Sequence, residues 1–172
     1  MYLAYPSEEM FLAFQRMIAD FEKHREARFE KERQWQVADF ERYVKMVADH
    51  REGINLPVGR MPQALYWLLN KEGEILGIGS IRLKMNEFLL REGGQIGYTV
   101  VPSYRNQGVG SYLLAALLKK AKDFNIRRLL VTCNEGNIGS KKIIEKNGGV
   151  FENKVFSDQK NTVVLRYWVD VE

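Results

Sequence analysis

The segment Val100–Ser111 constrains the fold of this chain more than any other. It joins an apolar strand pattern, which ends at Pro102, to an apolar helical pattern through a turn that holds Gly108 and Gly110. Glycines let backbone N–H groups approach a ligand, and the start of the following helix adds unpaired N–H donors and a partial positive charge. The segment therefore predicts either a pyrophosphate site or a tight strand-to-helix connection.

Two common phosphate-binding motifs do not account for this turn. The dinucleotide pattern G-x-G-x-x-G fails because Gly110 leads into Ser111-Tyr112-Leu113, with no third glycine. The Walker pattern fails in Gly136–Lys141 because the glycine spacing is too short.

The rest of the chain predicts helices first and then a sheet. Residues 8–52 lack proline and carry apolar residues at helical spacing, so they predict two helices, with Ser7 as the N-cap and a break in the charged middle. Short apolar runs follow a loop at 53–62. They predict a hairpin (Ala64–Leu69 and Ile75–Leu83), strands at Gln95–Val101, Leu129–Cys133, Val150–Phe156 and Thr162–Val171, a helix with an apolar stripe from Leu113 to Ala121, and a helix from about Asn137 to Lys146 that ends at a left-handed residue within 147–149. This order is typical of a mixed α/β (α+β) sheet with helices on its faces.

Composition excludes several classes of protein. The net charge of +4 comes from 26 basic and 22 acidic residues that are mostly interleaved, which favours a solvated surface over a nucleic-acid site and disfavours a polyamine substrate. No apolar run approaches the length of a membrane span, and the N-terminus lacks a secretory leader pattern. One cysteine and two histidines give no metal site, and they fit a reducing cytoplasm.

Two motifs point to a family. The run Arg105–Gly110 fits Q/R-x-x-G-x-G/A, with a V-x-P-x-x-R lead-in from Val100, and Asn134–Gly149 fits N-x-x-N-x-x-S-x-x-x-I-E-K-x-G-G. On these residues the chain resembles the GNAT superfamily of acyl-CoA-dependent N-acetyltransferases. In Tyr66–Leu68, Arg82–Asn86 and Gly93–Tyr98 it is similar to a bacterial group of predicted acetyltransferases, with Gln95 in place of that group's histidine.

The resemblance implies a fold and a function. The fold would be one domain over 1–172, with a helical acceptor-side segment (1–60) and an acetyl-CoA-binding core (61–172) whose mostly antiparallel sheet is splayed between its fourth and fifth strands. The function would be direct transfer of an acetyl group from acetyl-CoA to a primary amine of a small molecule or peptide, without a metal, by a chain that forms a homodimer, as is common in the family. The alternative is a non-catalytic acyl-CoA-binding or regulatory module on the same fold.

The resemblance also implies a set of residues that bind acetyl-CoA. They are Val100, Val101, Arg105, Asn106, Gln107, Gly108, Val109, Gly110, Ser111, Asn134, Asn137, Ser140 and Lys146. The pyrophosphate would lie in the turn, and pantetheine would pair with the strand edge at Tyr98–Val101. For Asn134 and Asn137 helix capping is an equal alternative, and Lys146 also fits a solvated surface charge.

The catalytic groups are less clear. Ile144 stands where many family members have a tyrosine acid, and Gly94 or Gln95 stands where others have a glutamate base. We take Tyr98 as the candidate catalytic residue, against the alternative that it is a packed aromatic. Glu92 is a second candidate, against the alternative of a loop charge.

Two further features have a structural interpretation as well as a functional one. The lone Cys133 is expected to be a buried apolar residue and not a nucleophile, since no histidine lies near it in the sequence. An aromatic cluster fits either core packing or an acceptor pocket; its members are Trp35, Phe40, Tyr43, Tyr66 and Trp67.

Overall fold

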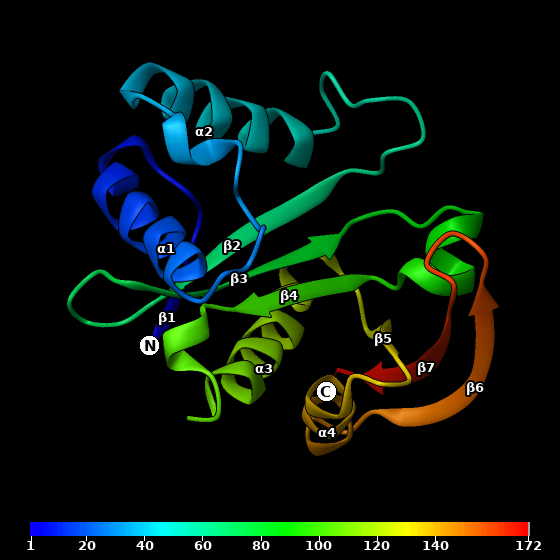
Figure 1. Cartoon of the computed structure of the whole chain (residues 1–172). Helices are drawn as coiled ribbons and strands as arrows, with labels where there is room; N and C mark the ends of the chain where they lie inside the picture. The colour runs from blue at the N-terminus through cyan, green and yellow to red at the C-terminus, as the bar shows by residue number, and fades with distance from the viewer. Residues whose placement is uncertain (172) are drawn as a thin grey trace.

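Seven strands form one sheet, with two helices on each face (Figure 1). The computed structural model describes residues 1–171. In chain order the elements are β1 (Tyr2–Ala4), α1 (Phe11–Lys23), α2 (Val37–Arg51), β2 (Gln63–Leu69), β3 (Ile75–Arg82), β4 (Ile96–Val100), α3 (Val109–Ala121), β5 (Arg128–Asn134), α4 (Ile138–Lys146), β6 (Val150–Ser157) and β7 (Thr162–Asp170). The mixed fold class is confirmed.

The strand order in the sheet is β1-β2-β3-β4-β5-β7-β6. All neighbouring strands are antiparallel except β4 and β5, which run parallel and share one residue pair, Ile96 with Val131. The predicted splay between the fourth and fifth strands is thus confirmed. These two are the third and fourth strands that the sequence predicts, and they become β4 and β5 because the short strand β1 pairs with β2 at the N-terminal edge of the sheet. The sequence does not reveal β1 or the π-helical turn Leu89–Gly93, since both are too short to show a periodic pattern.

The helices α1 and α2 cover one face of the sheet (Figure 1). On α1, the apolar positions at helical spacing are all buried: Phe14, Met17, Ile18 and Phe21. The Phe14 ring stacks on Trp67 of β2 with 5.5 Å between ring centroids and also packs against Phe40 of α2. Phe40 and Trp67 therefore belong to the core, whereas the neighbouring Tyr66 faces the other side of the sheet and stacks on Tyr5.

The helices α3 and α4 cover the opposite face, around a second core. Every member of the predicted α3 stripe is buried, and Leu117 packs so tightly on β3 that a Cβ at Gly79 would lie 2.4 Å from its Cδ1. The predicted left-handed residue after α4 is Gly148, with φ +82°. Ser7 precedes a short 3-10 turn at Glu8–Met10, but its hydroxyl donates to Glu9 and does not cap the turn. Within residues 1–171, the helices are too short or too polar to cross a lipid bilayer.

The docking of α1 gives a stability prediction. Phe14→Ala removes a ring that is 1% exposed and should lower the free energy of unfolding by about 3–5 kcal/mol. Leu12→Ala on the same helix is the control, because Leu12 is 65% exposed, and it should change stability by about 0.5 kcal/mol or less. Urea unfolding followed by tryptophan fluorescence measures both. Equal effects of the two substitutions would contradict the assigned face of α1.

Candidate functional site

The splay leaves one edge of β4 without a neighbouring strand. The Val101 N–H donates to the Leu76 carbonyl of β3 at 3.0 Å, and backbone direction alternates along a strand. The backbone groups of Tyr98 and Val100 therefore point away from β3, toward the side where β5 has diverged after the Ile96–Val131 pair. This edge can accept an extended, amide-containing ligand as an added strand.

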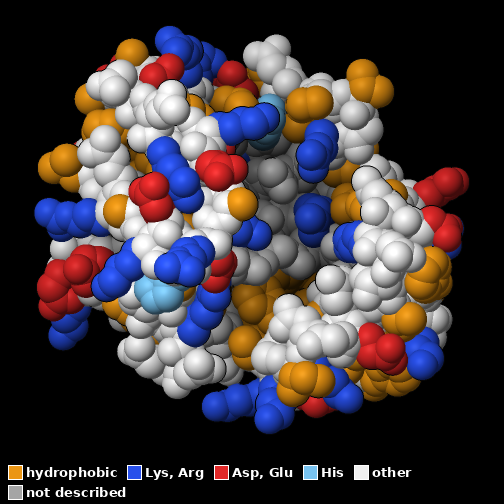
Figure 2. Space-filling model, viewed as in Figure 1, with side chains coloured by type: hydrophobic (Ala, Val, Ile, Leu, Met, Phe, Trp, Pro, Cys, Tyr) orange, Lys and Arg blue, Asp and Glu red, His pale blue; other side chains and the backbone are white. Residues whose placement is uncertain are grey.

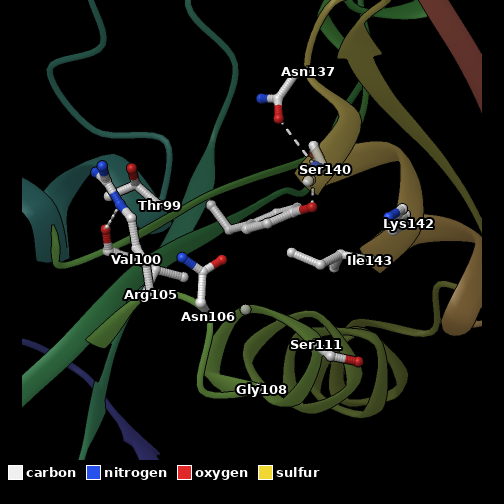
Figure 3. Close-up of a pocket in the computed structure, with 13 residues that line it drawn as sticks. Thr99, Val100, Arg105, Asn106, Gly108, Ser111, Asn137, Ser140, Lys142 and Ile143 are labelled. Carbon is white, nitrogen blue, oxygen red and sulfur yellow. Dashed lines mark hydrogen bonds between the residues drawn. The ribbon is translucent and has the colours of Figure 1, made fainter. Parts of the chain in front are cut away.

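A cavity of about 660 Å³ lies beside this open edge. Its walls come from β4, the glycine turn, the start of α3 and the first turns of α4 (Figure 3). The lining residues are Tyr98, Thr99, Val100, Arg105, Asn106, Gly108, Gly110, Ser111, Asn137, Gly139, Ser140, Lys142 and Ile143. The volume is in the range of cavities that bind small-molecule ligands.

The two turn glycines have different structural roles. Gly108 is the N-cap of α3 with φ +80°, and a Cβ built on it would meet no atom within 4 Å, so it faces open space in the cavity. Gly110 has no room for a side chain, because a Cβ built on it would lie 2.7 Å from Cδ1 of Ile143 on α4. Gly110 thus allows α3 and α4 to pack closely, while Gly108 leaves room for a ligand at the helix N-terminus.

Two carboxylates from the N-terminal region hold the turn in place. Arg105 donates from Nη1 and Nη2 to the Glu26 carboxylate at 2.5 and 3.0 Å, and from Nε to the Val100 carbonyl at 3.2 Å. Hydrogen bonding to Arg105 lowers the pKa of Glu26, so this carboxylate is ionised at neutral pH. Asp20 of α1 accepts from the Ser103 backbone N–H at 3.0 Å and also from the Ser103 hydroxyl.

Tyr98 and Ser140 meet across the cavity. The Tyr98 hydroxyl lies 2.8 Å from Oγ of Ser140, which brings β4 and α4 together beyond the point where the strands part (Figure 3). Burial raises the pKa of Tyr98, and the hydrogen bond between Tyr98 and Ser140 opposes this only in part, so the phenol is protonated at neutral pH. Asn137 caps α4, since its side chain accepts from the Ser140 N–H at 3.0 Å, and it lines the cavity as well.

The structure brings nine of the sequence-predicted site residues to this cavity. They are Tyr98, Val100, Arg105, Asn106, Gly108, Gly110, Ser111, Asn137 and Ser140. The other five do not line it: Val101, Gln107, Val109, Asn134 and Lys146.

Each of the five lies elsewhere for a physical reason. Val101 is 1% exposed and packs into the core under α1, and Val109 is buried where α3 meets the sheet. The Gln107 side-chain amide donates to the Ser103 carbonyl, so it stabilises the turn and does not line the cavity. Asn134 and Lys146 are exposed, at the end of β5 and in the last turn of α4.

Thr99, which belongs to the predicted strand edge Tyr98–Val101, also lines the cavity, whereas sequence reasoning missed Gly139, Lys142 and Ile143. The helical period could have found two of them, because positions 142 and 143 share a face of α4 with Gly139, whereas Lys146 lies one turn beyond the cavity. Lys142 is thus the exposed ammonium at this site.

The remaining candidate groups are placed as follows. Glu92 is not an exposed loop charge: it is 6% exposed in the π-helical turn, its Oε2 has no hydrogen-bond partner within residues 1–171, and it does not line the cavity. Ile144 is fully buried. Cys133 is buried, and burial raises the pKa of its thiol, so it is not a thiolate at neutral pH. The part of the chain that the structure describes contains no cluster of His, Cys, Asp or Glu suited to a metal ion.

Comparison with known proteins identifies the class that this fold and cavity define. The sequence model of the Acetyltransferase (GNAT) family matches residues 15–149, more than half of the chain, and the protein belongs to that family. No curated protein sequence matches it significantly.

Several solved structures share the fold. The ribosomal L7/L12 alpha-N-protein acetyltransferase RimL, in complex with coenzyme A, aligns at TM-score 0.69 and 18% identity over 98% of this chain and 93% of its own. The microcin C7 self-immunity acetyltransferase MccE, in complex with acetyl-CoA and AMP, aligns at 0.68 and 14% over 98% and 91%. An N-acetyltransferase from Staphylococcus aureus Mu50 aligns at 0.62 and 16% over 99% and 98%.

The open space at Gly108 gives a binding prediction with a matched control. Gly108→Ala should weaken acetyl-CoA binding about tenfold or more, because a methyl group would lie where phosphate oxygens approach the α3 N-terminus. Gly148→Ala introduces an alanine at nearly the same φ, also with no atom within 4 Å, but away from the cavity. It reproduces the backbone strain alone and should leave the affinity unchanged. Calorimetric titration compares the two, and equal affinities would place the phosphates elsewhere.

Proposed function

We propose that this protein is an acetyl-CoA-dependent N-acetyltransferase that transfers the acetyl group directly to a primary amine. The observation that carries the proposal is the open β4 edge, which lies in one cavity with the N-terminus of α3. Family membership, the coenzyme A complex of RimL and the acetyl-CoA complex of MccE support the same donor.

The residues present fit acetyl-CoA as the second substrate. Gly108 leaves the α3 N-terminus open to a pyrophosphate, and Lys142 offers a cation on the opposite wall. The outward backbone groups of Tyr98 match an amide of pantetheine, as in strand addition. A thioester at the inner end of this groove would therefore lie next to the Tyr98–Ser140 pair.

The chemistry follows from these positions. The Val100 N–H is available to stabilise negative charge on the thioester oxygen as the neutral amine adds to the carbonyl carbon. The C–S bond then breaks, and the departing sulfur takes a proton from the Tyr98 hydroxyl, while the amine releases its own proton to water. Tyr98 regains a proton from solvent through Ser140. Since Ile144 and Gln95 cannot titrate and Cys133 is protonated, Tyr98 is the titratable side chain we assign to this step.

The test of the function has two stages. Calorimetry with acetyl-CoA, with dephospho-CoA and ATP as controls, should give saturable binding at a micromolar dissociation constant, about −8 kcal/mol. Thiol release in the presence of a panel of amines should then be amine-dependent. Tight binding with no thiol release across diverse amines would favour a non-catalytic acyl-CoA-binding module, and no binding would overturn the proposal.

The role of Tyr98 gives a kinetic prediction. Tyr98→Phe keeps the ring but removes the proton donor, so kcat should fall about 100-fold or more while the affinity for acetyl-CoA stays the same. Tyr2→Phe is the control, because Tyr2 is 52% exposed on β1 and lies outside the cavity. The wild-type rate should not fall with rising pH below about pH 10, since the pKa of Tyr98 lies above its ordinary value. An unchanged kcat in Tyr98→Phe would exclude this role.

A further inference from the structure

A second cavity lies on the other face of the sheet and is not part of the acetyl-CoA site. Its volume is about 820 Å³, and its walls come from the end of α2, the loop 54–61, the ends of β2 and β3, the π-helical turn and the β6–β7 loop. The space-filling view shows a hollow on this side of the molecule, with basic side chains, drawn in blue, along its walls (Figure 2).

The charge in this cavity has one sign. The charged or titratable residues that line it are Arg60, Arg82 and His50, and no Asp or Glu of residues 1–171 lines it. The other polar residues on its walls are neutral: Gln63, Asn86 and Gln159. The planar guanidinium group matches the geometry of a carboxylate or phosphate, so two arginines on a cavity that has no carboxylate offer that binding capacity to a ligand.

Neither arginine is neutralised within the described chain. Neither takes part in an ion pair, and the Arg82 guanidinium donates to two backbone carbonyls, Gly93 at 3.3 Å and Gly94 at 3.0 Å. Burial and the charge of Arg60 both lower the pKa of Arg82, so the two cations repel each other across the cavity. An anion placed between them would remove that repulsion.

The geometry also connects this cavity to the reaction centre. The Arg82 guanidinium lies over Gly97 of β4. A Cβ built on Gly97 would be 3.8 Å from Nη2 and 3.9 Å from Nη1 of Arg82. Neighbouring residues of a strand face opposite sides, so Tyr98 faces the acetyl-CoA cavity. Arg82 of the second cavity and Tyr98 of the acetyl-CoA cavity thus lie on opposite faces of the sheet at neighbouring residues of β4, close to the Ile96–Val131 pair where the sheet opens toward β5.

We infer that the acceptor of this acetyltransferase is an amine that also carries a carboxylate or phosphate group, which Arg60 and Arg82 bind. The inference rests on the proposed function and names the substrate class. An acceptor anchored by its anion on Arg82 holds its amine near the opening beside Gly97, within reach of a thioester on the Tyr98 side. A cationic acceptor such as a polyamine is excluded by the same charges.

The first test compares matched amines by thiol release at saturating acetyl-CoA. The pairs are glycine and glycinamide, O-phosphoethanolamine and ethanolamine, and the peptide amides Ala-Glu-Ala and Ala-Gln-Ala. The first pair tests a free amino acid as the source of the anion, the second tests a phosphate group, and the third tests an acidic peptide. At least one anionic member should exceed its neutral partner in kcat/KM about tenfold or more. Equal rates within all three pairs would overturn the inference and leave the proposed function intact.

The variants remove the anion site without touching the acetyl-CoA cavity. Arg60→Gln should abolish the preference for the anionic member and Arg60→Lys should retain most of it; the Arg60 side chain is exposed and makes no hydrogen bond in the described structure, so both should fold. Arg127→Gln is the control, because Arg127 is exposed and lines neither cavity.

A second readout does not depend on turnover. Protein saturated with CoA, so that its phosphate-binding turn is filled, is titrated with inorganic phosphate. Arg60→Gln should weaken phosphate binding about fivefold or more, and Arg127→Gln should not. If no amine is turned over but this difference is found, the anion site stands and the proposed function fails. If Arg60→Gln and Arg127→Gln bind phosphate equally, the anion site fails.

Discussion

The single residue pair between β4 and β5 is the constraint on which the rest of the structure depends. Gln95 N–H donates to the Leu130 carbonyl and Ile96 pairs with Val131, and after this point β5 turns away toward β7. A sheet interior normally satisfies its backbone groups by strand pairing, so an unpaired edge within the sheet is costly unless a ligand or solvent satisfies it. The opening therefore leaves an unpaired backbone edge on β4 that an extended ligand can join as an added strand.

The two halves of the chain hold this opening together. The N-terminal helices were expected to cover the acceptor side, yet Asp20 of α1 and Glu26 of the loop after it also fix Ser103 and Arg105 in the glycine turn. On the other side, Gly110 against Ile143 and the Tyr98–Ser140 contact set how far α4 stands from β4. The width of the cavity beside β4 is thus set by side-chain contacts between elements distant in the sequence.

Local patterns predicted most of the fold and part of the site. The helices, the hairpin and the final strands follow from apolar periodicity, and the family resemblance located the turn and the splay. The contacts that depend on tertiary packing were not predictable: the burial of Glu92, the side of the strand to which Val101 points, and the ion pair of Arg105. Lys142 was missed because it is not one of the positions that the family motif specifies. It lines the cavity because it lies on the face of α4 that is turned toward the cavity.

Under the proposed function, the charges of the two cavities divide the recognition of the two substrates. In the acetyl-CoA cavity Arg105 is compensated by Glu26, so affinity for the donor depends mainly on backbone groups, the α3 N-terminus and Lys142. In the second cavity Arg60 and Arg82 have no such compensation, so an anionic group gains the full interaction with both. Hydrogen bonds from the protein backbone suit a donor substrate that is always the same molecule. Arginines without an ion-pair partner can instead discriminate between amines with and without an anionic group. In the proposed reaction, selection of the acceptor therefore lies on the α2 side of the sheet, and the chemistry lies at the opening between β4 and β5.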